Sequence, residues 1–105
     1  MSDYGVVFMT AASREEAETI AAALVEKKLA ACVNIVSAVQ SVYWWEGKIC
    51  REQEVFMMAK TKTCLFSRLA SEVKALHSYK VPEIIMLSIS DGSADYLQWI
   101  ENVTE

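Results

Sequence analysis

The chain has 105 residues, of which 53% are hydrophobic and 23% charged, and its formal net charge at pH 7 is −4. This length and composition predict one globular domain, residues 1–105, with a sizeable buried core. The acidic balance argues against nucleic acid and anionic membranes as partners, and no apolar run approaches the ~20 residues of a membrane span. The three cysteines form no CxxC pair, so we expect reduced thiols in a cytoplasmic protein.

The first part of the chain predicts a strand and then a helix. Residues 5–10 are a short apolar run typical of a buried central strand. Ser13 followed by Glu16 fits a capping box at the start of a helix, and Lys27-Lys28 near its end match the helix dipole. The expected apolar face of this helix consists of Ala17, Ile20, Ala21, Leu24, Val25 and Leu29.

Residues 31–61 predict an unusually long β-hairpin. Its tip is at residues 45–48, where Gly47 supplies the positive φ of a two-residue turn. An arm of about 14 residues at ~3.3 Å each extends ~46 Å, whereas a compact domain of this size is ~33 Å across. The hairpin is therefore expected to bend or to project beyond its own subunit. We place a bulge or bend at residues 37–41, where the apolar alternation is interrupted.

The outgoing arm of this hairpin is apolar on both sides. Val55 and Met57 point to one face of the strand, and Phe56 and Met58 point to the other. One face can cover the core of the domain itself, but the other needs a different packing partner. We therefore predict that another copy of the chain helps to cover it.

After the hairpin, the sequence predicts a helix, a strand and a further helix. A second amphipathic helix is predicted from Leu65 to Leu76, entered through Thr61 or Thr63 and ended before Pro82. Residues 83–90 predict a fourth strand that is apolar enough to lie inside the sheet. After it, Asp91-Gly92 predicts a turn, Ser93 a helix cap, and the residues beyond a short terminal helix.

This order of elements predicts an α+β, ferredoxin-like βαββαβ sandwich. It would have four antiparallel strands, two helices on one face, an extended hairpin between the second and third strands, and a C-terminal helix. The length of the hairpin exceeds what the plain ferredoxin-like fold requires.

Candidate catalytic and metal-ligating residues are few. His77 is the only histidine, so any histidine-based dyad must include it. Thiolate and thioether groups suit Cu(I), which makes His77, the three cysteines and the five methionines candidate copper ligands. No two of them have the spacing of a metal site within one chain, and cysteines that pack as small hydrophobes are the favoured interpretation.

Polar residues also interrupt the apolar strands. They are Tyr43, Trp45, Glu54 and Lys60 on the hairpin, and Tyr79, Lys80 and Glu83 around Pro82. Two interpretations stay open: a solvated rim or intersubunit ion pair, which is favoured, and the wall of a ligand pocket.

Several motifs resemble those of the CutA family of divalent-cation tolerance proteins. They are Ala30-Ala31-Cys32-Val33-Asn34, Tyr43-x-Trp45-x-Gly47, Glu54 with Lys60-Thr61, His77-x-Tyr79-x-x-Pro82-Glu83-Ile84, and Tyr96-x-x-Trp99. The resemblance covers essentially the whole chain. It implies a tight homotrimer, similar in architecture to the PII signalling proteins, in which long hairpins complete the sheets of neighbouring subunits. It also implies an association with tolerance to copper and other divalent cations.

The chain departs from the family pattern at two positions. Some members have a cysteine at the end of the first strand and a doubled histidine before Pro-Tyr, and these are the proposed copper ligands. Here the corresponding residues are Met9 and Leu76-His77-Ser78. His77 is thus the one strong ligand that carries over, and Met9 offers a thioether for Cu(I).

Three functional hypotheses follow, in this order. The first is a cytoplasmic, homotrimeric, non-enzymatic binding or regulatory protein, with metal or small-molecule clefts between subunits. The second is a direct binder of copper or another divalent cation that uses His77 with Cys or Met ligands. The third is a small hydrolase built on Lys60, His77 and Glu83 in an intersubunit cleft. The predicted cleft residues are Cys32, Tyr43, Trp45, Lys60, His77, Tyr79 and Glu83.

Overall fold

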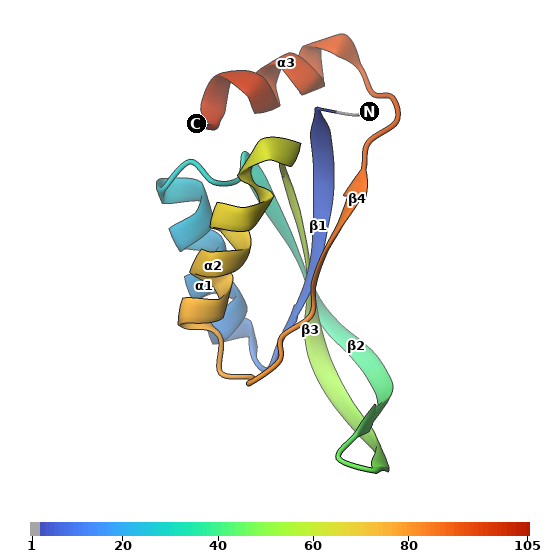
Figure 1. The fold of residues 1–105 in the computed structure, drawn as a ribbon. Coiled ribbons are helices and arrows are strands. Elements are labelled where there is room, and N and C mark those ends of the chain that lie inside the picture. The colour runs from blue at the N-terminus through green and yellow to red at the C-terminus, as the bar shows by residue number, and fades with distance from the viewer. Residues whose placement is uncertain (1–2) are drawn as a thin grey trace.

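The chain folds into one four-stranded antiparallel sheet with two helices on one of its faces and a third helix at one end (Figure 1). The computed structural model describes residues 3–105. The predicted α+β, ferredoxin-like fold is confirmed, with sheet order β2-β3-β1-β4. The elements are β1 (Tyr4–Ala11), α1 (Arg14–Glu26), β2 (Cys32–Trp45), β3 (Lys48–Lys62), the 3₁₀ turn η1 (Thr63–Leu65), α2 (Phe66–Leu76), β4 (Ile84–Ser88) and α3 (Ala94–Val103).

The first strand is central, as predicted, because β1 pairs with β3 on one side and β4 on the other. The prediction that the fourth strand lies inside the sheet is wrong. Among residues 3–105 β4 pairs with β1 alone and forms an edge of the sheet, with Ile85 51% and Leu87 46% exposed. An apolar sequence indicates that the two faces of a strand are covered by other side chains. It does not indicate which strands pair with its edges.

Helix α1 begins as predicted at Ser13, but Glu16 does not complete the predicted capping box. Ser13 is the N-cap and its Oγ accepts a hydrogen bond from the Glu16 N–H at 3.1 Å. In a capping box the glutamate would accept from the cap's own N–H. Glu16 instead accepts from the N–H of Ala12 at 2.9 Å and of Ser78 at 2.7 Å. Glu16 therefore bonds to the residue before the cap and to the distant Ser78, and not to the N–H of Ser13.

The end of α1 lies earlier than the sequence pattern predicts. The helix stops at Glu26, so Lys27 caps it and Lys28 adopts a φ of 59°, outside the last turn. Val25, predicted on the apolar face, is 44% exposed, whereas Leu29 is buried from the loop that follows. The left-handed residue turns the chain away from the helix axis, and this lets Leu29 reach the core.

The long hairpin is confirmed in its turn, its bulge and its projection. Glu46 and Gly47 have φ values of 52° and 78°, as a type I′ turn requires. Val36 pairs with Phe56 and Val39 with Glu54, so Ser37 and Ala38 form the predicted bulge. The β1–β3 ladder ends at Val55. Beyond it β2 and β3 continue as a two-stranded ribbon that extends past the helices, and the molecule measures 44 × 26 × 23 Å (Figure 1). We call residues 39–54 the arm, and the rest of the fold the body.

The two faces of β3 differ as predicted. Val55, Met57 and Ala59 are at most 5% exposed, within the core formed with α1 and α2. On the opposite face Phe56 packs edge-on against Phe8, with ring centroids 5.2 Å apart, and both rings stay partly exposed. At one end of that open face α3 contacts β3, and its Glu101 bonds to Tyr4 and Lys62, whereas α1 and α2 lie on the opposite face of the sheet (Figure 1). Cover of the open face by another copy of the chain remains a prediction.

The entry to α2 differs from the prediction, and its exit does not. Neither predicted threonine caps it: Thr61 Oγ1 donates to the carbonyl of Leu29 at 2.6 Å, and Thr63 begins η1. The 3₁₀ turn leads directly into α2, which ends at Leu76, well before Pro82. In the last helix Ser93 is the predicted cap, with its Oγ accepting from the Tyr96 N–H at 3.2 Å.

Candidate ligand site

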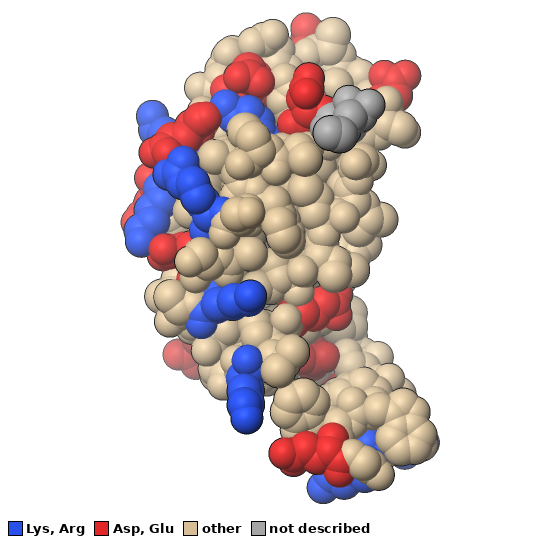
Figure 2. Space-filling model, in the orientation of Figure 1, with Lys and Arg blue, Asp and Glu red and all other residues tan. Residues whose placement is uncertain are grey.

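A hollow of about 950 Å³ lies between the arm and the segment that follows α2. Four of the predicted cleft residues line it: Tyr43 and Trp45 from the arm, and Tyr79 and Glu83 from the segment before β4. Figure 2 shows acidic side chains where the arm meets the body, and Glu52 and Glu54 are lining residues there. We call this cavity the ligand hollow.

The register of the arm explains which side chains share its inner face. After the bulge Ser41 pairs with Glu52, Tyr43 with Cys50, and Trp45 with Lys48. Paired residues of an antiparallel ladder point to the same face, so this face carries Glu54 and Glu52 near the base of the arm and Tyr43 and Trp45 toward its tip. The hydroxyl of Tyr43 donates to the carboxylate of Glu52 within the arm.

Tyr79 makes a second phenol–carboxylate contact at the base of the arm. Its hydroxyl donates to Glu54 Oε2 at 2.7 Å, and Glu54 is 8% exposed. Burial first, and then the hydrogen bond and negative charge of Glu54, raise the pKa of Tyr79. Tyr79 therefore remains a protonated donor at any ordinary pH. Within residues 3–105 Glu54 has this phenol as its partner and no ion pair.

His77 lies behind Tyr79 and supports it. Its Nδ1 accepts a hydrogen bond from the Tyr79 N–H at 3.0 Å, and its Nε2 lies 2.7 Å from the carbonyl oxygen of Thr10. Because a carbonyl only accepts, Nε2 carries the proton and donates to it. The rings of His77 and Tyr79 also contact each other, with centroids 4.7 Å apart. Both ring nitrogens are thus engaged by the protein.

The predicted metal ligands do not converge within one chain. Residues 3–105 contain no group of three or more His, Cys, Asp or Glu side chains placed to hold a metal ion. Met9, at the family's cysteine position, is 1% exposed and belongs to the core below α1 and α2. A metal at His77 would have to displace either Thr10 or the Tyr79 amide from the ring.

Cys32 and Lys60 lie at the opposite end of the hairpin. They face each other across β2 and β3, and the Lys60 ammonium donates to the side chain of Asn34. The thiol of Cys32 lies 3.6 Å from the same Asn34 oxygen. Burial, and then the proximity of Cys32, raise the pKa of Tyr96 on α3. Lys60 is six strand residues from Glu54, ~20 Å along β3.

One chain therefore divides the seven predicted residues into two groups. Tyr43, Trp45, Tyr79 and Glu83 line the hollow, with His77 behind them, while Cys32 and Lys60 lie at the far end of the hairpin. Lys60, from the hydrolase hypothesis, is separated in the same way from His77 and Glu83.

Sequence reasoning missed two residues at this site. Glu52 lies two positions before Glu54, so the period-2 rule for strands places it on the same face and was a usable signal. Thr10 lines the hollow from the end of β1. Glu16 was predicted as part of a capping box, but its contact with Ser78 has no local signal, because the two residues are 62 positions apart in the sequence.

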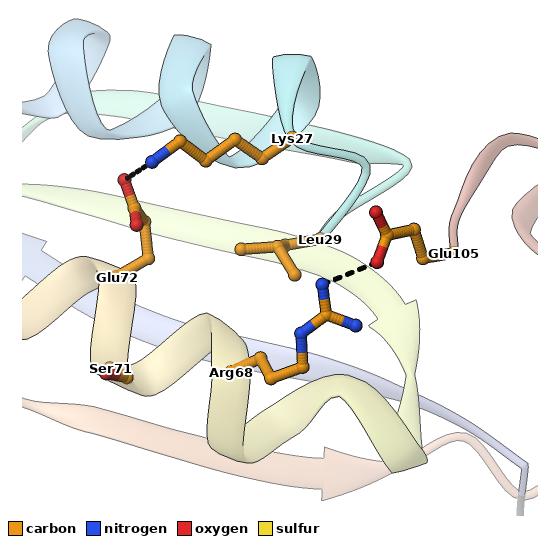
Figure 3. A pocket seen from close by; sticks show the side chains of 6 residues that line it. All are labelled: Lys27, Leu29, Arg68, Ser71, Glu72 and Glu105. Carbon is orange, nitrogen blue, oxygen red and sulfur yellow. Dashed lines mark hydrogen bonds and ion pairs between the residues drawn. The ribbon is translucent and has the colours of Figure 1, made fainter.

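A second hollow, of about 440 Å³, lies between the end of α1 and α2 (Figure 3). Its charged groups are already paired: Lys27 lies 2.7 Å from Glu72, and Arg68 lies 2.5 Å from Glu105. These are largely exposed ion pairs, which contribute little to stability. None of the seven predicted cleft residues lines this hollow.

The fold, with its long projecting hairpin, is consistent with the PII-like class of architecture that the sequence motifs imply. Residues 5–103 match the model of the CutA1 divalent ion tolerance protein family. The chain belongs to this family, as the motifs indicated.

Three relatives illustrate the similarity. The divalent-cation tolerance protein CutA of Thermus thermophilus is 50% identical over 99 residues, which cover 94% of this chain and 96% of that protein. The chloroplastic protein CutA 1 of Oryza sativa is 44% identical over 99 residues, 94% of this chain but only 56% of the rice protein. The structure of the periplasmic divalent cation tolerance protein CutA of Archaeoglobus fulgidus superposes with a TM-score of 0.95 at 46% identity, covering 97% of this chain and 99% of that one.

These names place relatives in different compartments, so they do not support the predicted cytoplasmic location. In the part of the chain that the structure describes, no helix is both long enough and apolar enough to cross a membrane.

Proposed function

We propose that this CutA-family chain is a homotrimeric, non-enzymatic binding or regulatory protein whose ligand clefts form between subunits. The observation that carries the proposal is the arm, which leaves large apolar side chains uncovered: Val42 is 58%, Ile49 50% and Trp44 72% exposed. A two-stranded ribbon of this kind is marginally stable alone, and uncovered apolar patches usually mark interaction sites. The open face of the sheet, with Ile85 and Leu87, needs the same cover.

The division of the seven predicted residues supports the same proposal. Cys32 and Lys60 lie ~20 Å along β3 from the hollow that Tyr43 and Tyr79 line. A cleft that contains all seven therefore requires two subunits, one for each group.

We also propose that residues 1–105 form one domain. The three cysteines carry no disulfide, and this supports a reducing, cytoplasmic location.

The mass of the assembly in solution tests the proposal. Size-exclusion chromatography with light scattering is expected to give three times the 11.8 kDa chain mass. Ile49→Asp, which puts a charge on the exposed apolar side of the arm, is expected to lower this mass. Lys74→Asp on the exposed surface of α2 is the matched control and should leave it unchanged. A monomeric parent protein would overturn the proposal.

Direct binding of copper or another divalent cation is the second candidate. The name of the Thermus thermophilus relative, a divalent-cation tolerance protein, favours it, and His77 is the residue through which we propose it acts. Calorimetric titration with Cu(I) and Cu(II) should then show saturable binding that His77→Ala weakens. Unchanged affinity in that variant would count against direct metal binding.

No contact in the structure favours the hydrolase hypothesis, and a broad substrate screen is expected to show no turnover.

A further inference from the structure

Tyr79 joins the body to the arm at the point where the arm begins. Its hydroxyl donates to Glu54 Oε2 at 2.7 Å. Glu54 directly follows Val55, whose pairing with Ala11 is the last of the β1–β3 ladder. On the other strand Glu54 pairs with Val39, the first paired residue after the bulge. The Tyr79–Glu54 hydrogen bond therefore lies at the base of the arm.

This base is where the direction of the arm is least fixed by the backbone. The bulge interrupts the ladder between β2 and β3, and β3 loses its second neighbour at the same point. Bulges bend and twist the strand that contains them. Within residues 3–105, the bond between Tyr79 and Glu54 is the one side-chain hydrogen bond or ion pair found between the arm and the body.

The backbone around Tyr79 is held from the opposite side. Its N–H donates to His77 Nδ1, and the adjacent Ser78 N–H donates to Glu16 Oε2 at 2.7 Å. The other oxygen of Glu16 accepts from the Ala12 N–H at 2.9 Å. Partial burial acts to raise the pKa of Glu16, but the hydrogen bonds from Ala12 and Ser78 outweigh it and lower that pKa. Glu16 is therefore a charged acceptor that fixes this segment to the start of α1.

We propose that Tyr79 is a positioning residue: its hydrogen bond to Glu54 sets the direction in which the arm leaves the body, and with it the shape of the ligand hollow. The hollow lies between these two parts, since Tyr79 and Val81 line one side and Tyr43 and Trp45 the other. This inference rests on the proposed function, because the direction of the arm decides whether it meets a neighbouring subunit. Glu16 acts behind Tyr79 by holding its backbone.

The exchange of subunits between assembled proteins tests this role. Unlabelled and ¹⁵N-labelled proteins are mixed, and the appearance of mixed trimers is followed by native mass spectrometry. Tyr79→Phe removes the hydroxyl and keeps the ring beside His77. We expect exchange at least about tenfold faster, the factor that a hydrogen bond to a charged group is worth. Lys27→Met is the matched control, since it removes a charged hydrogen bond of the same length, 2.7 Å to Glu72, that lies wholly within the body, and should change the rate less than about twofold.

Two variants of Glu54 give a second, independent readout. Glu54→Gln keeps an oxygen that accepts from Tyr79 and is expected to exchange close to the parent rate. Glu54→Leu removes the acceptor and is expected to exchange as fast as Tyr79→Phe, and combining the two should add no further increase. This non-additivity separates a shared bond from a general loss of stability.

The possible results distinguish a failure of the positioning role from a failure of the proposed function. Equal exchange rates for Tyr79→Phe and Lys27→Met in a trimeric protein would overturn the positioning role and leave the proposed function intact. Slow exchange in Glu54→Leu would overturn it in the same way. A parent protein that native mass spectrometry shows as a monomer would overturn the proposed function, and this inference with it.

Discussion

The two ends of the β2–β3 hairpin are built from similar residues but are stabilised in different ways. At the base, Val55, Met57 and Ala59 have strands on both sides and helices above them, and they are at most 5% exposed. In the arm, Val42 and Trp44 belong to a two-stranded ribbon and are 58% and 72% exposed. Apolar side chains of one hairpin thus form part of a core at one end, and at the other end a surface that needs a partner.

The two phenol–carboxylate pairs show the same contrast. Tyr43 and Glu52 both belong to the arm, so their bond links the two strands of one ribbon. Tyr79 and Glu54 join two segments that are 25 residues apart in the sequence, and Glu54 is 8% exposed. Chemically equivalent contacts therefore have different consequences, because only the second crosses from the body to the arm.

The largest effect is expected at the base of the hairpin. Met57→Ala deletes a fully buried side chain and should lower the free energy of unfolding by about 2–5 kcal/mol, since it leaves a cavity. Chemical denaturation measures this. Met58→Ala, one residue along on the open face, is the control and should cost clearly less in any monomeric state, where no second chain covers that face. Equal losses would contradict the two-faced description of β3.

In the arm, the effect of truncation should depend on assembly. Trp44→Ala removes a side chain that is 72% exposed, so within one chain it has little contact to lose. We expect a change below about 0.5 kcal/mol in any monomeric state, and a weaker trimer on dilution. Light scattering over a concentration series measures the second effect. A trimer as resistant to dilution as the parent would show that Trp44 lies outside the interface.

Glu16 should make stability depend on pH. Its folded-state pKa is lowered from 4.5, so its contribution is fully present above pH 4.5 and is lost as the pH falls through the folded-state pKa. The side chain is partly exposed to solvent, which limits the contribution to about 1 kcal/mol. Glu16→Gln should reduce the difference in unfolding free energy between pH 7 and pH 3 by about that amount. Glu15→Gln on the same helix is the control.

The smallest effect is expected at the second hollow. Lys27→Ala removes an ion pair with Glu72 that is 2.7 Å long but has a lysine side chain 59% exposed. Exposed pairs contribute about 0.2–1 kcal/mol, and the loss should shrink further in high salt. Thermal unfolding at low and high ionic strength measures it. A large, salt-independent loss would mean that this hollow has a structural role.

Much of the fold follows from local patterns in the sequence. The positive φ at Gly47, the bulge after Val36, the cap at Ser13 and the opposite faces of Val55 and Phe56 were all predicted correctly. Each depends on residues close together in the chain, where periodicity, turn chemistry and capping act directly.

The errors lie where distant residues decide the outcome. The sequence predicted an interior position for β4, which is an edge strand, and a purely local role for Glu16, which contacts Ser78. Neither the pairing partners of a strand nor the tertiary partner of a carboxylate leaves a periodic signal in the chain.

By itself, the sequence determined the family motifs, the order of the elements and a hairpin too long for its own body. Only the tertiary structure decided that Tyr79 meets Glu54 at the base of the arm, and that Cys32 and Lys60 lie ~20 Å along β3 from there. The physical reason is that local patterns fix backbone conformation and which side of a strand a residue faces. The register and topology of the sheet then decide which of those sides meet.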